Sequence, residues 1–236
     1  PAFVDIPLRG LTSKKYADAL AQQIRPDSAR SAQTIKPGHP LPFESDQTTH
    51  YSVVDQAGNM VAVTYTLNTN FGSGIVAAGT GILLNNEMDD FSAKPGVPNA
   101  YGLVGGAANA VAPGKRPLSS MTPTLVLKEQ QPWLVTGSPG GARIITTVLQ
   151  QIVNGIDFGM NPAEAAATVR FHHQWMPDEL RVEKGFSPDT LHLLRQKGQN
   201  VVVKPAMGRT QTIQVQGQAL WGYSDPRNPD GLTLGY

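Results

Sequence analysis

The 236-residue sequence contains no cysteine, so a disulfide scaffold, a thiolate metal site and a cysteine nucleophile are excluded. This absence does not identify the cellular compartment, because periplasmic proteins can also lack cysteine. Long apolar runs are missing as well. The longest ones, Val61–Leu67 and Ile75–Leu84, have the length of strands and are interrupted by Thr or Gly. A membrane helix needs about 20 apolar residues, and we therefore expect no membrane span.

An excess of charge of either sign is also absent, with 19 basic residues, 18 acidic residues and a net charge of +1. This balance gives no indication of a nucleic-acid partner or of binding to an anionic membrane surface. Hydrophobic residues make up 40% of the sequence, which excludes disorder over its whole length. The sequence begins with Pro1, and Val4–Ile6 has the pattern of a strand. We expect a piece of a longer product, without a signal peptide in this part.

The first quarter of the sequence changes from a helical to a β pattern. A capping Ser13 and apolar residues at four-residue spacing predict a helix over Thr12–Arg25. Asp27–Gln47 is rich in proline and polar residues and is predicted to be a linker or a long exposed loop. A hairpin is then predicted from Tyr51–Asp55 and Met60–Leu67, with Gly58 and Asn59 suited to positive φ in its turn.

Further strands and helices alternate over the rest of the sequence, and together they predict an α+β fold in which helices cover sheets. The long loop Asp90–Gly114 is typical of a functional segment such as a lid. The predicted strands are Ile82–Leu84, Thr124–Lys128, Trp133–Thr136, Val201–Val203, Thr212–Val215 and Leu220–Tyr223, and the predicted helices are Ile144–Val153, Asn161–Val169 and Ser187–Gly198.

The glycine-rich turn Gly137–Gly141 joins a predicted strand to a predicted helix. Backbone N–H groups at such a helix start can bind an anion or stabilise an oxyanion during acyl transfer. The turn is not a phosphate-binding Walker motif, because Ala142 and Arg143 stand where that motif needs glycine and lysine. A tight turn that needs glycine for steric reasons is the simpler interpretation, and spacing alone slightly favours it.

Thr48 opens the β region directly after the proline-rich segment. A threonine there is usually only a β-branched strand residue. If the Gln47–Thr48 bond is cut, however, the free α-amine of Thr48 can act as the general base for its own hydroxyl. Such a site needs neither histidine nor cysteine. The sequence has no G-x-S-x-G motif, which gives a conventional Ser-His-Asp hydrolase little support.

Other polar groups allow two interpretations each. The acidic run Asn85–Asp90 can hold an ammonium group or form a solvated turn, and it lacks the pattern of a calcium loop. Ser119 and Ser120 can donate to a carboxylate or cap a turn. The adjacent His172 and His173 do not have the spacing of metal ligands, and a structural or surface role is favoured. We expect no metal site.

Five stretches, taken together and in this order, resemble γ-glutamyltranspeptidase, and bacterial members most closely. They are Thr48–Asp55, Thr64–Asn68, Gly81–Phe91, Lys115–Met121 and Gly137–Gly141.

The resemblance covers essentially the whole chain. It implies the N-terminal-nucleophile hydrolase fold, an αββα sandwich of two stacked, mainly antiparallel sheets flanked by helices, of which this chain represents only a part. It also implies that residues 1–47 are the C-terminal end of a large subunit, that residues 48–236 are the small catalytic subunit, and that the precursor cuts itself at Gln47–Thr48.

The same resemblance assigns the catalytic groups. Thr48 resembles the nucleophile that takes the γ-glutamyl group, and Thr66 resembles the hydroxyl that hydrogen-bonds and supports it. Gly140 and Gly141 resemble the oxyanion-hole N–H donors. No cofactor and no metal are implied.

The substrate-binding residues follow in the same way. Asn68, Glu87 and Asp90 resemble the groups that bind the substrate α-amine, and Ser119 and Ser120 resemble the donors to its α-carboxylate. Some bacterial members have Gln where Glu87 stands, and either side chain supplies an acceptor.

Two further elements of the family's site are implied. Pro95–Gly106 corresponds to a lid loop, with Tyr101 as the residue that closes over the pocket. An Arg of the large subunit that also binds the α-carboxylate has its matching region upstream of Pro1, so a chain with only these residues is expected to lack full activity.

The implied activity is γ-glutamyl transfer and hydrolysis acting on glutathione and related γ-glutamyl amides, with water or an amino-acid or peptide amine as acceptor. The implied partner is the large subunit, and the implied location is periplasmic or secreted. A related cephalosporin-type acylase is the second enzyme considered, but Glu87 and Asp90 suit a cationic α-amine that a glutaryl group lacks. An unprocessed, non-catalytic precursor fragment is the third alternative.

Overall fold

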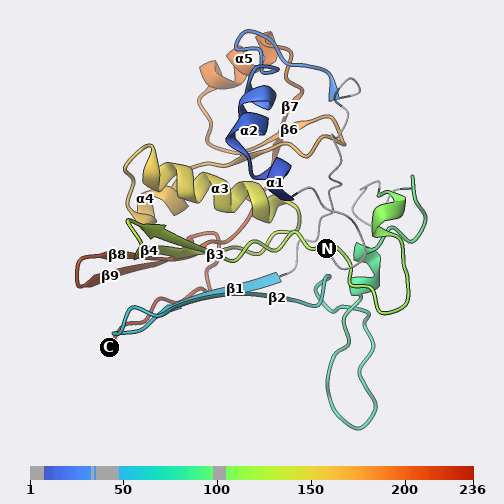
Figure 1. Cartoon of the computed structure of the whole chain (residues 1–236), viewed down its shortest axis with the longest axis vertical. Coiled ribbons are helices and arrows are strands. Elements are labelled where there is room, and N and C mark those ends of the chain that lie inside the picture. The colour runs from blue at the N-terminus through green and yellow to red at the C-terminus, as the bar shows by residue number, and fades with distance from the viewer. Residues whose placement is uncertain (1–7, 33–34, 36–47, 98–104) are drawn as a thin grey trace.

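The structure, a computed structural model, describes residues 8–32, 35, 48–97 and 105–236. A two-stranded sheet is stacked on a four-stranded sheet, and helices cover the other face of the four-stranded sheet (Figure 1). Within the described part of the chain, no helix covers the outer face of the two-stranded sheet (Figure 1). The predicted α+β class and the partly represented αββα sandwich are confirmed, with the helix–sheet–sheet layers present.

The two-stranded sheet is the predicted hairpin. Strand β1 (Thr48–Val54) pairs antiparallel with β2 (Met60–Thr66). In the turn, Gly58 has a φ of 83°, whereas Asn59 does not adopt positive φ. The expectation for Asn59 was wrong because one glycine suffices to reverse the chain, while Asn59 is bonded through its N–H and its side chain to the carboxylate of Asp55.

The four-stranded sheet has the order β3-β4-β8-β9 and is antiparallel throughout. Its inner strands are β4 and β8. In β4, the side chains of Leu134, Val135 and Thr136 are almost inaccessible to solvent. The hydroxyls of Thr136 and Thr212 hydrogen-bond across the sheet at 2.7 Å. Its strands are β3 (Thr124–Lys128), β4 (Gln131–Thr136), β8 (Gln211–Gln216) and β9 (Ala219–Ser224), close to the predicted ranges.

Two helices follow β4 and lie over this sheet (Figure 1). Helix α3 (Arg143–Ile156) buries Ile144 and Val148 on one face, as its apolar spacing predicts. Helix α4 (Pro162–Ala167) begins with a complete capping box, in which Asn161 and Glu164 satisfy each other's backbone N–H groups.

A third sheet was only partly predicted. Its order is β5-β6-β7, and it lies at the top of Figure 1 beside the N-terminal helices and α5. Only β7, α2 and α5 were expected from the sequence, and α1 was not. Helix α2 is capped by Ser13 as predicted, but it ends at Ala21 rather than Arg25. The elements are α1 (Leu8–Leu11), α2 (Lys14–Ala21), β5 (Phe171–His172), β6 (Leu180–Glu183), α5 (Pro188–Gln196) and β7 (Val201–Lys204).

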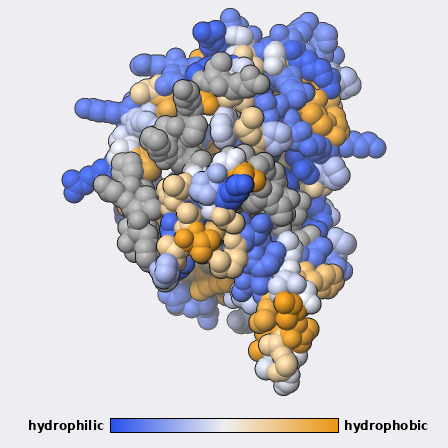
Figure 2. All heavy atoms as spheres, turned by 90° about the vertical axis from the view of Figure 1, so that its right-hand side faces the viewer, coloured by the Kyte–Doolittle hydropathy of each residue, from blue (hydrophilic) through white to orange (hydrophobic). Residues whose placement is uncertain are grey.

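The predicted strand Ile82–Leu84 was wrong. Within the described residues, it forms only one isolated bridge, between Val76 and Leu83. Residues 71–84 instead form a narrow ribbon that projects from the sheets (Figure 1) and is visible as an apolar projection in Figure 2. Phe71 and Ile82 are more than half exposed there.

A buried cluster of charges ties the C-terminal segment to α4 and β6. Arg170 donates to Asp225 at 2.5 Å, and Arg227 bridges Asp225 at 3.1 Å and Glu183 at 2.6 Å. Burial opposes ionisation of Asp225, but the charge of Arg170 and backbone N–H donors outweigh it and hold the pKa of Asp225 below its usual value. The cluster is therefore an ionic tie within the core rather than a surface pair.

We expect Asp225→Ala to destabilise the full-length protein strongly. The substitution leaves Arg170 buried without its carboxylate partner, and breaking a buried pair from one side costs about 3–5 kcal/mol. Urea unfolding measures the loss. The matched control is Lys204→Ala, which removes the more exposed pair of Lys204 and Glu179 and is expected to cost less than about 1 kcal/mol. Equal losses in the two variants would contradict this account of the cluster.

Candidate active site

A small cavity lies where the first residue of β1, the end of β2 and the start of α3 meet. Seven residues predicted from the sequence line it: Thr48, Thr66, Asn68, Asp90, Ser119, Ser120 and Gly141. The remaining lining residues are Leu118, Met121 and Ile144. Segments that are more than 90 residues apart in the sequence therefore meet at one place.

Pairing between β1 and β2 places Thr48 directly opposite Thr66. Side chains of directly opposed residues lie on the same face of the sheet with Cβ atoms about 5 Å apart. The Thr66 hydroxyl accepts the backbone N–H of Asn68 at 2.9 Å. The strand pairing therefore places a second hydroxyl beside Thr48, and the hydrogen bond from Asn68 holds this hydroxyl in position.

Asn68 lies at the point where the chain leaves β2. It is fully buried and has a φ of 74°, a conformation that asparagine tolerates better than most residues. Its side-chain amide donates to the carbonyl of Asn86 at 3.2 Å, and the N–H of Asn86 donates to the carbonyl of Leu67 at 3.1 Å. These bonds hold the end of β2 against the acidic segment.

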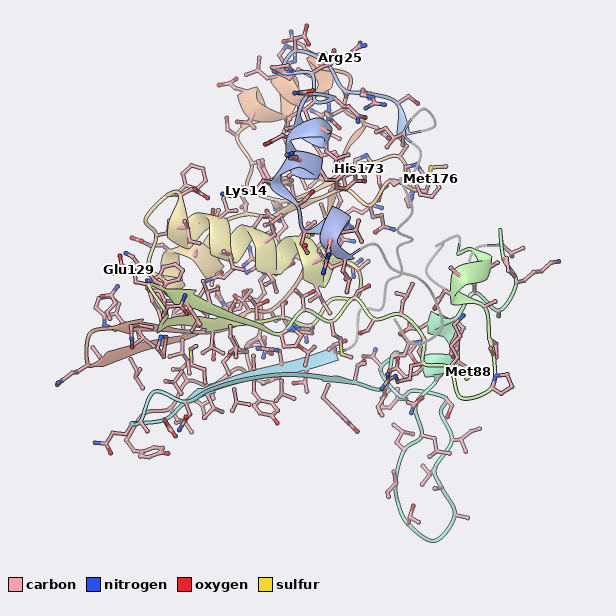
Figure 3. The ribbon with its side chains drawn as sticks, in the orientation of Figure 1. Lys14, Arg25, Met88, Glu129, His173 and Met176 are labelled. Atoms are coloured by element: carbon pink, nitrogen blue, oxygen red, sulfur yellow. The ribbon has the colours of Figure 1, made fainter. Side chains whose placement is uncertain are left out.

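The acidic segment forms a single 3-10 turn, Glu87–Asp90. Figure 3 shows the turn at Met88, at the end of the molecule opposite the β3–β4 turn marked by Glu129. Asp90 lines the cavity, whereas Glu87 does not line it but lies close enough to Asp90 to raise the pKa of that group.

The two carboxyl groups perturb each other. Burial, the hydrogen bond and charge of Glu87, and the charge of Asp89 raise the pKa of Asp90 to about 7. Burial likewise raises the pKa of Glu87. Because the pKa of Asp90 lies at about 7, a proton is retained on this group in a large part of the molecules near neutral pH, and an incoming cation would favour its release.

The turn Gly137–Gly141 is buried and connects the end of β4 to the start of α3. Gly140 and Gly141 have φ values of 137° and 64°, which side chains rarely adopt, so the steric interpretation of the turn holds. Gly141 also lines the cavity, and the preceding residue, Gly140, lies beside the backbone of Gly208. The same conformation that requires glycine therefore presents the backbone of the helix start to the cavity.

His50 is a component of the site that the sequence patterns did not indicate. Its ring occupies the space beside Gly137, where an added Cβ would lie 2.2 Å from the imidazole. The ring nitrogens bond the hydroxyls of Thr64 at 2.8 Å and Ser52 at 3.1 Å. Burial lowers the pKa of His50 to about 4, so the ring is neutral at ordinary pH.

The remaining predictions have mixed outcomes. Tyr101 and most of the predicted lid lie outside the described residues, as does Gln47. His172 is buried and bonded to Thr146 and Gln174, in agreement with the structural role favoured for it. Over the ranges described, no group of three or more His, Asp or Glu side chains could hold a metal ion. No helix in those ranges is long and apolar enough to cross a membrane.

Several solved structures share this architecture. A mutant γ-glutamyltranspeptidase of Helicobacter pylori matches with a TM-score of 0.75 at 57% identity, over 76% of this chain and 100% of that one. A cephalosporin acylase of Bacillus halodurans matches with a TM-score of 0.80 at 29% identity, over 96% of this chain and 39% of that one.

Sequence relatives agree with the structural match. The glutathione hydrolase proenzyme of Escherichia coli strain K12 is 66% identical over 237 residues, which cover 100% of this chain and 41% of that protein. The chain thus spans about two fifths of the length of the curated relatives that it matches. The family model described as gamma-glutamyltranspeptidase matches residues 1–234. The chain belongs to the gamma-glutamyltranspeptidase family.

Proposed function

We propose that the full-length protein containing this chain transfers and hydrolyses γ-glutamyl groups of glutathione and related amides through an ester on Thr48. The observation that carries the proposal is the shared cavity, which is lined by a nucleophile candidate, an acidic group, hydroxyl donors and a helix start. The 66% identity to a glutathione hydrolase proenzyme supports the choice of substrate.

The reaction begins with maturation. Cleavage of Gln47–Thr48 divides the chain into residues 1–47 and 48–236 and frees the α-amine of Thr48. That amine accepts the hydroxyl proton as the Thr48 oxygen attacks the γ-carbonyl carbon. Thr66 supports the hydroxyl from the opposed strand. The proton then passes to the leaving amine, and water or another amine cleaves the ester to regenerate Thr48.

Two sets of groups support the chemistry. Backbone N–H groups of Gly140 and Gly141 face the negative charge that develops on the carbonyl oxygen, with fixed dipoles that need no reorganisation. On the other side, Asp90, aided by Glu87 and Asn68, binds the α-ammonium group. The hydroxyls of Ser119 and Ser120 donate to the α-carboxylate.

The rest of the precursor is part of this proposal. Most of the length of the curated relatives lies outside this chain, and a large subunit that supplies an arginine to the α-carboxylate completes the site. Tyr101 closes the pocket as part of a lid. A periplasmic or secreted location rests on the resemblance alone.

The acylase alternative differs from this proposal in one group of the substrate. A γ-glutamyl donor carries an α-ammonium beside its carboxylate, and a glutaryl donor does not. The half-buried carboxyl pair of Glu87 and Asp90 suits only the first of these substrates, because it can neutralise an ammonium group. The same choice is favoured by sequence identity, which is 66% to the Escherichia coli glutathione hydrolase proenzyme and 57% to the Helicobacter pylori γ-glutamyltranspeptidase, against 29% to the cephalosporin acylase.

We expect Thr48→Ala in the full-length precursor to abolish cleavage and activity together, because one hydroxyl serves both reactions. Gel electrophoresis and mass spectrometry follow the cleavage, and glutathione hydrolysis follows the activity. Thr48→Ser is the matched control. It keeps the hydroxyl and should retain slow processing. A folded Thr48→Ala precursor that still divides between Gln47 and Thr48 would refute the proposed role.

We expect the KM for glutathione to rise as the pH falls below about 7, the pKa of Asp90. Below that pH the carboxyl pair keeps its proton, and the α-ammonium of the substrate must expel it before it can bind. Glu87→Gln removes the neighbouring charge that raises the pKa of Asp90, so the rise in KM should begin at lower pH.

The measurement is the pH profile of KM for the native and Glu87→Gln enzymes. Glu164→Gln, a similar change at an exposed helix cap, is the matched control and should leave the profile unchanged. If Glu87→Gln leaves the position of the acid limb unchanged, the carboxyl pair does not govern binding of the amine.

A further inference from the structure

Asn109 connects the two sides of the cavity. Its side-chain amide donates to the carbonyl of Asp90 at 2.6 Å, and its side-chain oxygen accepts the backbone N–H of Leu118 at 3.1 Å. Asp90 belongs to the acidic turn, and Leu118 directly precedes Ser119 and Ser120. One side chain therefore bonds the backbones of both segments that line the cavity.

The side chain is built into the molecule at this position. Asn109 is 7% exposed, so its two bonds are largely shielded from water. Its own carbonyl accepts the N–H of Ser92 at 2.9 Å, and the N–H of Asn109 donates to the carbonyl of Gly106 at 3.1 Å. Since the backbone around Asn109 is fixed on both sides, its side chain can act as a spacer of constant length.

The chemistry of the bridge is specific to an amide. A carbonyl can only accept a hydrogen bond and an N–H can only donate one, so the bridging group needs one donor and one acceptor. An asparagine offers both at adjacent atoms. Alanine offers neither, and an aspartate carboxylate offers only acceptors.

We infer that Asn109 is a positioning residue that sets the separation between the amine-binding and carboxylate-binding sides of the site. The inference rests on the proposed function, in which Asp90 binds the α-ammonium and Ser119–Ser120 bind the α-carboxylate. Both groups of the substrate are attached to one α-carbon. The two sides must therefore be held at a fixed separation for both to bind at once. Asn109 touches neither the substrate nor Thr48 in this scheme.

The test is steady-state kinetics of Asn109→Ala in the full-length, processed protein, with L-γ-glutamyl-p-nitroanilide as substrate. Loss of two neutral hydrogen bonds that hold the recognition groups should raise KM about ten-fold. The nucleophile and the oxyanion-binding turn do not depend on Asn109, so kcat should change less than about three-fold. A merely structural role would lower the amount of active enzyme and leave KM unchanged.

Two further variants make the outcome decisive. Asn109→Asp has nearly the same shape, keeps the acceptor for Leu118 and loses the donor to Asp90, so it should also raise KM. Lys115→Met is the matched control, because Lys115 bonds the neighbouring carbonyls of Ala108 and Ala110 without contacting Asp90 or Leu118. It should leave KM within about two-fold of the native value.

Circular dichroism and thermal melting establish that each variant is folded. A native KM in folded Asn109→Ala and Asn109→Asp, or a fall in kcat as large as the rise in KM, would overturn the inference. A native enzyme that does not release p-nitroaniline would instead refute the proposed function, so the two failures are distinguishable.

Discussion

The contact between His50 and Gly137 joins the two halves of the candidate site. Thr48 and His50 lie on the same face of β1, while Gly137 begins the turn that presents Gly141 to the cavity. Ser52 strengthens the contact, because its hydroxyl donates to the carbonyl of Gln211, whose N–H donates to the carbonyl of Gly137. A side chain at position 137 would separate the strand from the turn. The distance between nucleophile and helix start therefore depends on one glycine and one neutral ring.

Among the described residues that line the cavity, Asp90 is the only one with an ionisable side chain. His50, on the same face of β1 as Thr48, is neutral because burial lowers its pKa. Glu87 and Asp90 accumulate negative charge against the cost of burial and therefore resist ionisation. A cationic group bound beside these carboxylates offsets both the cost of their burial and the repulsion between their negative charges. The site is thus better matched to an α-ammonium than to a neutral or anionic group at the same position.

Sequence patterns predicted the elements whose signals are local, and missed those that depend on distant partners. The first hairpin, the cap of α2 at Ser13 and the capping box of α4 could be predicted because the residues that interact in each lie close together in the sequence. Strands β5 and β6 are short. β5 pairs with β6 and β6 pairs with β7, and the carboxylate of Glu183 accepts the backbone N–H of Arg170, which directly precedes β5. His50 was missed for the same reason, since its partner Gly137 is remote in sequence. The motifs included seven of the residues that line the cavity, but they did not indicate the bridge at Asn109.

The most direct test of the central claim is to find where an electrophilic glutamine analogue attaches to the processed full-length protein. Peptide mass spectrometry after inactivation locates the adduct. The account predicts one adduct, on the peptide that begins with Thr48, and on the Thr48 oxygen within it. An adduct on any other residue, or on a chain still joined through Gln47–Thr48, would contradict the assignment of Thr48 as an N-terminal nucleophile.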